Sequence, residues 1–209
     1  MLKYILMNIQ NINDVVAALR ARLEPVELAD TLLDTPEGRL PRVRKSAVLL
    51  GLFEQDGQTS LLFIRRSSTL RAHSGEIAFP GGGFDPTDSS LVMTALREAQ
   101  EEVGLNPANV EVLGALPSVF TVVSNYLILP VVAFLPEGLG TLQLQPSEVA
   151  EIILIPLFAL VNPAIFHTEE WIHDGQSRTV YFYDYGAYRI WGATARMLNS
   201  LLETINRHK

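Results

Sequence analysis

Hydrophobic residues recur along the chain at two spacings, which separate the segments that form helices from those that form strands. Behind Asn11 or Asn13, apolar residues follow a helical period and predict a helix within residues 11–23. Residues 46–66 hold two apolar runs on either side of Asp56-Gly57, a pair typical of a tight hairpin turn. The first part of the chain therefore predicts a helix followed by a β-hairpin.

A central helix is predicted at residues 89–105, where Leu96, Ala99 and Val103 share one face and Gly104 supplies a left-handed end. Further strands are expected at residues 110–116, 127–135, 151–157 and 179–185, and a closing helix at residues 192–209. Because strands lie on both sides of the central helix, the order predicts an α+β fold with a mixed sheet and helices packed on it. We expect one domain over residues 1–209, with residues 1–40 or so as an N-terminal helical extension.

Composition is typical of a compact globular protein. The chain has 209 residues, of which 48% are hydrophobic and 19% charged, enough to bury a sizeable core. Its 16 Lys and Arg against 23 Asp and Glu give a net charge of -7, so no overall field attracts a nucleic acid. There is no cysteine and no apolar run long enough to cross a bilayer. We expect a cytoplasmic protein without nucleic-acid or membrane partners, whose apolar content permits a homodimer.

Three glutamates, Glu98, Glu101 and Glu102, crowd into about one turn of the central helix. With Glu98 at zero, Glu101 falls near -60° and Glu102 near +40°, whereas Leu96, Ala99 and Val103 fall between about 100° and 160°. The pattern places the carboxylates on one face, beside the buried stripe and not within it. Their repulsion, and the unfavourable helix dipole near the C-terminal end, are offset if they hold a divalent cation.

A glycine run, Gly81-Gly82-Gly83, precedes this helix and allows the main chain to approach a ligand closely. Joined to the glutamates at this spacing, it resembles the signature of the Nudix hydrolases, G-x5-E-x7-R-E-U-x-E-E-x-G-U with U aliphatic. Gly83, Arg97, Glu98, Ala99, Glu101, Glu102, Gly104 and Leu105 are in register with it. The departure is Ser89, which stands where the family has its first glutamate and has Asp88 beside it. We expect activity to survive, since in the family that glutamate mostly supports the loop.

The segment before the glycines narrows the resemblance to the coenzyme A diphosphatases, with a pattern of roughly L-L-T-x-R-[SA]-x3-R-x3-G-x3-F-P-G-G. The positions that fit are Arg66, Ser67, Arg71, Gly75, Phe79, Pro80, Gly81 and Gly82, whereas Ile64 replaces the usual threonine. The two patterns form one block from Leu62 to Leu105. The resemblance implies a Nudix α/β/α sandwich that uses Mg²⁺ or Mn²⁺ to cleave CoA or a derivative into 3′,5′-ADP and 4′-phosphopantetheine.

The resemblance also assigns roles to residues. Glu98 and Glu102 are the expected metal ligands, with the Gly82 carbonyl as a further donor; Glu101 is either a ligand or the group that activates water. Glu148, from a late loop, is a weaker candidate for the base, with a surface carboxylate as the alternative. Arg97 is expected to hold Glu101. Arg66, Arg71 and Gly81 are expected to meet the substrate, although Arg66 or Arg71 could instead pair with a carboxylate under the loop.

Other readings of the same residues stay open. The Nudix signature defines the chemistry and the pocket defines the substrate, so a different nucleoside diphosphate such as ADP-ribose is one alternative. A non-catalytic nucleotide-binding domain is another, suggested by Ser89. His73 is expected to be structural or exposed, Phe79-Pro80 to fix the loop, and Trp191 to anchor the closing helix or stack on adenine.

Overall fold

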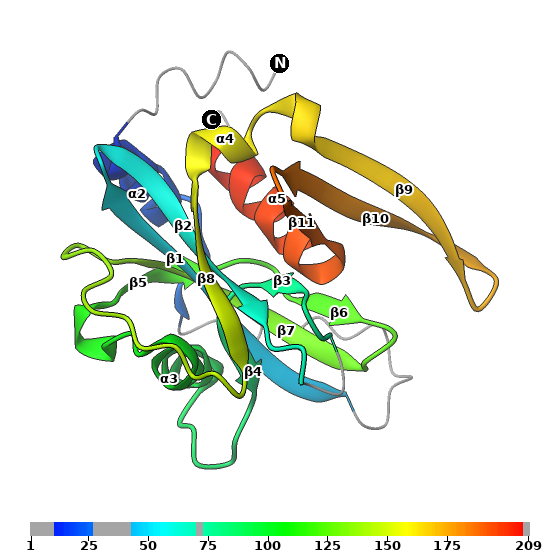
Figure 1. Cartoon of the computed structure of the whole chain (residues 1–209), viewed down its shortest axis with the longest axis horizontal. Coiled ribbons are helices and arrows are strands. Elements are labelled where there is room, and N and C mark those ends of the chain that lie inside the picture. Colours follow the sequence, from blue (N-terminus) through cyan, green and yellow to red (C-terminus); the bar gives the residue numbers. More distant parts are fainter. Residues whose placement is uncertain (1–10, 27–42, 70–72, 207–209) are drawn as a thin grey trace.

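Two β-sheets and three α-helices of two turns or more make up the part of the chain described by the computed structural model, residues 11–26, 43–69 and 73–206 (Figure 1). The predicted N-terminal helix is α2 (Ile12–Arg20), and the Asp14 amide donates to the Asn11 side chain at its start. The predicted hairpin is β1 (Arg44–Gln55) and β2 (Gln58–Arg66). Asp56 and Gly57 both have positive φ, as a two-residue turn of this kind requires.

The remaining elements follow in chain order. They are β3 (Ile77–Ala78), β4 (Gly81–Gly83), α3 (Leu91–Val103), the short η3 (Pro107–Asn109), β5 (Glu111–Ala115), β6 (Val119–Thr121), β7 (Tyr126–Phe134), β8 (Val149–Pro156), α4 (Leu157–Leu160), η4 (Pro163–Ile165), β9 (Phe166–His173), β10 (Gln176–Tyr185), β11 (Tyr188–Trp191) and α5 (Gly192–Asn206). Every helix and strand predicted from the sequence is present in the described residues. The prediction lacked the short strands β3, β4, β6 and β11 and the longer β9.

The main sheet is mixed, as predicted. Its strands follow the order β3-β2-β1-β7-β5, with β4 paired to β1, β6 to β7 and β8 to β2. Only β1 and β7 run parallel; the other pairs among the described strands are antiparallel. A second sheet of three antiparallel strands has the order β11-β10-β9.

Alternate residues of the main sheet enter two separate cores. On β1, Ala47 and Leu49 pack with Ala95, Ala99 and Val103 of α3. Leu50 and Leu52 point to the other face and belong with the buried residues of α2 and α5. Since both faces are covered, β1 reads as a nearly continuous apolar run in the sequence. Figure 1 shows α5 lying between the main sheet and the second sheet, so the layers are α3, main sheet, α5 with α2, and second sheet.

The closing helix is anchored as the periodicity predicted. Met197, Leu198, Leu201, Leu202 and Ile205 are all buried. Trp191 lies at the end of β11 and packs against Trp171 and Phe182 of the second sheet. No helix in the described ranges combines the length and apolar character needed to cross a bilayer.

Candidate active site

The glycine run forms β4, a short strand that pairs antiparallel with β1 through Ser46, Ala47 and Val48. A Cβ on Gly81 would lie 2.3 Å from the Ala47 carbonyl oxygen, so the backbone of β1 excludes any side chain there. A Cβ on Gly82 would lie 2.4 Å from the Glu98 carboxyl carbon. The glycines therefore let a strand and a carboxylate of α3 come into direct contact.

Helix α3 is capped at both ends, and Gly104 at its C-terminal end is the cap that the sequence predicted. The Ser90 side chain accepts from the Met93 amide at the start, and Gly104 ends the helix with φ of 72°. The loop of residues 143–145 then covers its C-terminal end, where the Gln143 and Gln145 amides donate to the carbonyls of Val103 and Glu102. These contacts hold the glutamate-bearing turn rigidly against the sheet.

The predicted position of the glutamates beside the buried stripe is wrong for Glu102. Its side chain is only 2% exposed, against 15% for Glu98 and 57% for Glu101. The buried face centres on Leu91, Ala95 and Ala99, at about 20°, 60° and 100° from Glu98, and Glu102 at about 40° falls in its middle. Leu96, taken as part of the buried stripe, is half-buried. The three carboxylates thus run from solvent into the core.

Glu102 is a buried carboxylate with two partners. The Gly81 amide donates to its Oε2 at 2.9 Å, and Arg66 Nη1 lies 3.7 Å from its Oε1. Burial raises the pKa of Glu102 to about 7, and the negative charges of Glu98 and Glu148 contribute in the same direction. Such a group is held in place and is costly to ionise unless a cation comes close.

Glu98 is the second desolvated carboxylate of the cluster. Burial raises its pKa, and the repulsion of Glu101 and Glu148 adds to the effect, while hydrogen bonding from Arg97 opposes it. Its Oε1 accepts from Arg97 Nη1 at 2.8 Å, and the carboxyl group lies over Gly82 of β4. Glu98 and Glu102 therefore face the same short strand from adjacent positions on α3.

Arg97 joins the loop to the helix. It donates to both carboxylate oxygens of Asp88, at 2.9 and 3.0 Å, and to the Gly83 carbonyl at 3.2 Å. Its Nη1 also donates to Glu101 Oε2 at 3.0 Å, as the sequence predicted. The bidentate Asp88 partner is the main reason that the Arg97 pKa is raised.

Asp88 makes the supporting contacts that are expected of the first glutamate of the signature, whose position Ser89 occupies. Besides Arg97, the Asp85 amide and the Thr94 hydroxyl donate to its Oδ2, at 3.1 and 2.8 Å. These hydrogen bonds, led by the one from Arg97, hold the pKa of Asp88 well below its usual range. Ser89 itself is exposed. The loop before α3 is therefore supported by a carboxylate one position earlier than in the family signature.

Glu148 and Arg66 complete the surroundings. Glu148 is exposed, and its charge acts on both Glu98 and Glu102, which places it on the same side of the site. The carbonyl of Glu148 accepts from the Ser67 amide, so its loop is attached directly beside Arg66. The Arg66 Nε is buried and has no hydrogen-bond partner in the described part of the chain. Arg71 lies outside the described residues, and His73 is exposed and hydrogen-bonded to Glu76, as expected of a loop residue.

The donor set fits a hard divalent cation only in part. Across the described residues, no three acidic or histidine side chains form a ready-made metal cage, since Arg97 lies between Glu98 and Glu101. Mg²⁺, however, is usually held by one or two carboxylates together with substrate phosphates. Glu98 and Glu102, two desolvated carboxylates beside the Gly82 backbone, suit that mode of binding.

Sequence reasoning missed two supports of this network, Thr94 and Asp85. Thr94 is fully buried on a helix that otherwise buries apolar residues and Glu102. A β-branched hydroxyl residue at that position, six residues after Asp88, was the available signal. The Asp85 carboxylate accepts from the Thr87 amide, and the Asp85 amide donates to the Asp88 carboxylate.

Comparison with known proteins identifies the family. The NUDIX domain model matches residues 43–174. A protein of Photorhabdus laumondii described as "Uncharacterized Nudix hydrolase NudL" is 43% identical over 162 residues, 78% of this chain and 85% of the relative. A protein of Escherichia coli with the same description is 38% identical over 158 residues, 76% of this chain and 81% of the relative.

Solved structures align with part of the chain. The NUDIX domain of Shewanella oneidensis NrtR complexed with ADP ribose aligns with a TM-score of 0.45 and 21% identity, over 62% of this chain and 83% of that one. The family model and the two relatives cover the glycine strand, the glutamate helix and the loop that carries Glu148. The chain therefore belongs to the Nudix hydrolase family and is a hydrolase that acts on pyrophosphate bonds.

Proposed function

We propose that this Nudix hydrolase cleaves the diphosphate of coenzyme A or a CoA derivative. The products are 3′,5′-ADP and 4′-phosphopantetheine, or its acylated form. The observation that carries the proposal is the unbroken block from Leu62 to Leu105, in which the CoA-type pattern on β2, β3 and β4 runs directly into the Nudix glutamates on α3. Arg66, from the first part of that block, lies 3.7 Å from Glu102, from the second part.

In this proposal, Glu98, Glu102 and the Gly82 carbonyl hold Mg²⁺ or Mn²⁺. Members of this family generally depend on a divalent cation, which neutralises the diphosphate and polarises the attacking water when bound. The raised pKa values of Glu98 and Glu102 support the assignment, because a cation compensates the cost of ionising both in a desolvated site. Arg97 keeps Glu98 in position through a hydrogen bond and links it to Asp88.

Two carboxylates compete for the role of the base that accepts the proton of water. Glu101 Oε2 accepts a hydrogen bond from Arg97 Nη1 at 3.0 Å, so this oxygen already has a partner. Glu148 makes no side-chain hydrogen bond or ion pair among the contacts found in the described residues, and its charge acts on both candidate metal ligands. We therefore favour Glu148 as the base and Glu101 as a positioning partner of Arg97.

Arg66 is proposed to bind the substrate. Its side chain is 28% exposed, and Glu102, at 3.7 Å from Nη1, is its ion-pair partner among the described residues, so the guanidinium keeps donors for a phosphate oxygen. Arg71 is proposed for the same task on the sequence pattern alone. Hydrogen bonds from these two guanidinium groups would favour a substrate that carries a further phosphate besides its diphosphate, as CoA does.

The decisive experiment is to incubate the purified full chain with CoA, 3′-dephospho-CoA or ADP-ribose, each with Mg²⁺ or Mn²⁺, and to separate the products by chromatography. We expect 3′,5′-ADP and 4′-phosphopantetheine from CoA. The Glu102→Gln variant should lose at least about two orders of magnitude in rate. Glu54→Gln, an exposed substitution on β1 with the same change of charge, should keep full activity.

The other outcomes decide between the alternatives. Cleavage of ADP-ribose with no action on CoA would replace the proposed substrate and leave the metal helix intact. CoA binding without turnover of any substrate would indicate a nucleotide-binding domain. Normal turnover by Glu102→Gln would remove Glu102 from the metal site.

A further inference from the structure

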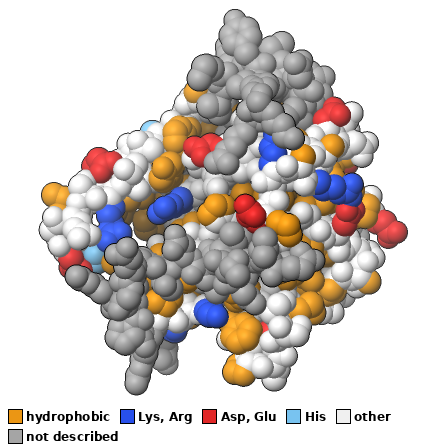
Figure 2. All heavy atoms as spheres, turned by 180° about the vertical axis from the view of Figure 1, so that it is seen from behind, with side chains coloured by type: hydrophobic (Ala, Val, Ile, Leu, Met, Phe, Trp, Pro, Cys, Tyr) orange, Lys and Arg blue, Asp and Glu red, His pale blue; other side chains and the backbone are white. Residues whose placement is uncertain are grey.

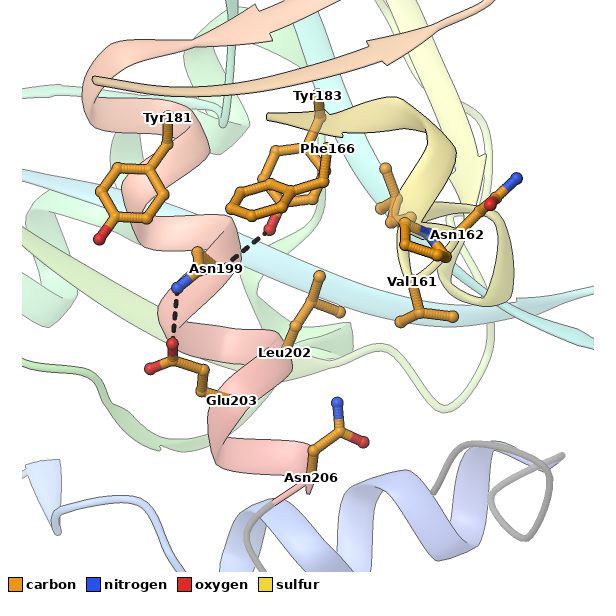
Figure 3. Close-up of a pocket in the computed structure, with 11 residues that line it drawn as sticks. Val161, Asn162, Phe166, Tyr181, Tyr183, Asn199, Leu202, Glu203 and Asn206 are labelled. Carbon is orange, nitrogen blue, oxygen red and sulfur yellow. Dashed lines mark hydrogen bonds between the residues drawn. The ribbon is translucent and has the colours of Figure 1, made fainter. Parts of the chain in front are cut away.

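A pocket of about 500 Å³ lies between α5, the α4–η4 segment and strands β9 and β10 (Figure 3). Its walls are mostly apolar and aromatic. Leu160, Val161 and Leu202 form one side, and Phe166, Tyr181 and Tyr183 form the other. Its volume is in the range of sites that bind small organic molecules.

This pocket is separate from the glutamate site. Leu160, Tyr183 and Leu202 belong to the core on the α5 side of the main sheet, whereas the buried residues of α3 belong to the core on the opposite side. The whole thickness of the sheet therefore lies between the pocket and Glu98. A ligand in this pocket is not the diphosphate that the glutamates would process.

The side chains that line the pocket are either neutral or negatively charged. Glu203 is the one charged residue among the described residues that line it, and no Lys, Arg or His is among them. The Tyr183 hydroxyl donates to Asn199 Oδ1 at 3.1 Å, and Asn199 Nδ2 donates to Glu203 Oε1 at 2.8 Å. These two hydrogen bonds orient the Glu203 carboxylate and leave its Oε2 without a part in them, as Figure 3 shows.

Asn206 gives a second, independent indication of a ligand. It lies on α5 two residues past Thr204, and its side chain points toward the space between Leu202 and Val161 (Figure 3). Both of its amide atoms, Nδ2 and Oδ1, are buried and have no hydrogen-bond partner among the described residues. A buried amide in that state is costly, and a ligand donor that reached Oδ1 would remove part of the cost.

We propose that this pocket binds an organic cation with an apolar body, such as an arylalkylammonium. The ammonium group would donate to Glu203 and Asn206, and the apolar body would fill the space between Phe166, Tyr181 and Leu202. The exposed Glu203 carboxylate at the rim of the pocket and the aromatic rings inside it favour a cation, because the negative ring faces and the carboxylate attract the same charge. The same groups repel anions, so nucleotides and phosphates are poor ligands here.

The test measures binding of phenethylammonium to the full chain by changes in the methyl NMR signals of Leu160, Val161 and Leu202. Two probes of similar size serve as comparison, neutral 2-phenylethanol and anionic 3-phenylpropionate. We expect phenethylammonium to bind about tenfold tighter than the alcohol, and the anion not to bind. Equal binding of the cation and the anion would overturn the proposal, as would no shift of these methyl signals with the cation.

Variants make the test specific. Glu203→Gln keeps the size of the side chain and an acceptor for Asn199, and should weaken phenethylammonium about tenfold while leaving 2-phenylethanol unchanged. Glu54→Gln, with the same change of net charge on a distant strand, should have no effect. Val161→Trp, at a half-buried wall position, should block both probes. Unaltered affinity for the cation in Glu203→Gln, with the variant folded as judged by its NMR spectrum, would refute the proposed site.

Discussion

At the scale of single residues, the burial of Glu102 has a cost that the protein without metal must bear. Its pKa is raised to about 7 from an ordinary 4.5. Between these two pH values, the folded state keeps a proton that the unfolded chain has already lost. The folded state is therefore destabilised by this group as pH rises from about 4.5, and the full penalty is present above pH 7 or so. A bound cation reverses the penalty.

Glu102→Gln should therefore stabilise the metal-free protein at high pH. We expect its free energy of unfolding to exceed that of the unmodified protein by about 1–3 kcal/mol at pH 8 and by little at pH 5. The measurement is urea unfolding with a chelator present, repeated at both values of pH. With excess Mg²⁺ the order should reverse or narrow, because only the carboxylate gains from the cation.

Glu101→Gln is the matched control for this prediction. It lies one position away on the same helix but is more than half exposed. Its stability should follow that of the unmodified protein at both values of pH, apart from the loss of its Arg97 contact. Parallel pH curves for Glu102→Gln and the unmodified protein would contradict the burial penalty.

The sequence predicted which glutamates lie close together better than it predicted their environments. The spacing of Glu98, Glu101 and Glu102 was sufficient to group them, since helical geometry depends only on position. The predicted position of Glu102 is wrong because the predicted stripe of Leu96, Ala99 and Val103 leaves out Ala95, a small residue that is buried close to Glu102 on the helix face that packs on the sheet. The role of Asp88 depends on the path of the loop, which spacing alone does not determine.

At the scale of elements, the strands with apolar faces were predictable and those without were not. Strands β1, β2 and β7 bury side chains on both faces, and β8 buries one face and half-buries most of the other; all four stand out as apolar runs. Strand β9 exposes most of its residues, including Glu169 and Glu170, and has no comparable pattern. It is a strand because its backbone pairs with β10. This pairing between two segments has no counterpart in the hydrophobic pattern of β9 itself.

The three glycines of β4 have different neighbours, which predicts three different results for substitution by alanine. Gly81→Ala would place a Cβ 2.3 Å from a backbone carbonyl of β1, which cannot move away, so we expect a loss of several kcal/mol of stability. Gly82→Ala would meet only the end of the Glu98 side chain, at 2.4 Å, which can move. We expect this variant to fold normally and to lose at least about tenfold in diphosphatase activity.

Gly83→Ala is the control, because a Cβ at that position meets nothing within 4 Å. It should keep both stability and activity. Thermal unfolding and a diphosphatase assay on all three variants would separate the two effects. Full activity in Gly82→Ala would show that the position of Glu98 over β4 is not needed for turnover.

At the scale of the whole molecule, the second sheet extends the part that matches the family model. That match ends at residue 174, whereas β10, β11 and α5 follow it. Strand β9, inside the match, pairs along its whole length with β10, outside it. Helix α5 then returns between the two sheets and buries Leu198 and Leu201 completely. We propose that the described residues unfold as one cooperative domain.

Leu201→Ala tests this proposal, because it removes packing at the centre of the layers. We expect a loss of about 2–5 kcal/mol, as for other large-to-small changes in a core. Both tryptophans of the chain, Trp171 and Trp191, lie in the second sheet, so their fluorescence reports on that sheet while far-UV circular dichroism reports on all elements. In a single domain the two transitions coincide and shift together, and Val123→Ala, at a position 85% exposed, shifts neither. If the fluorescence transition shifts while the main circular dichroism transition stays, the second sheet with α5 is a separate unit, and the glutamate site would keep its stability without it.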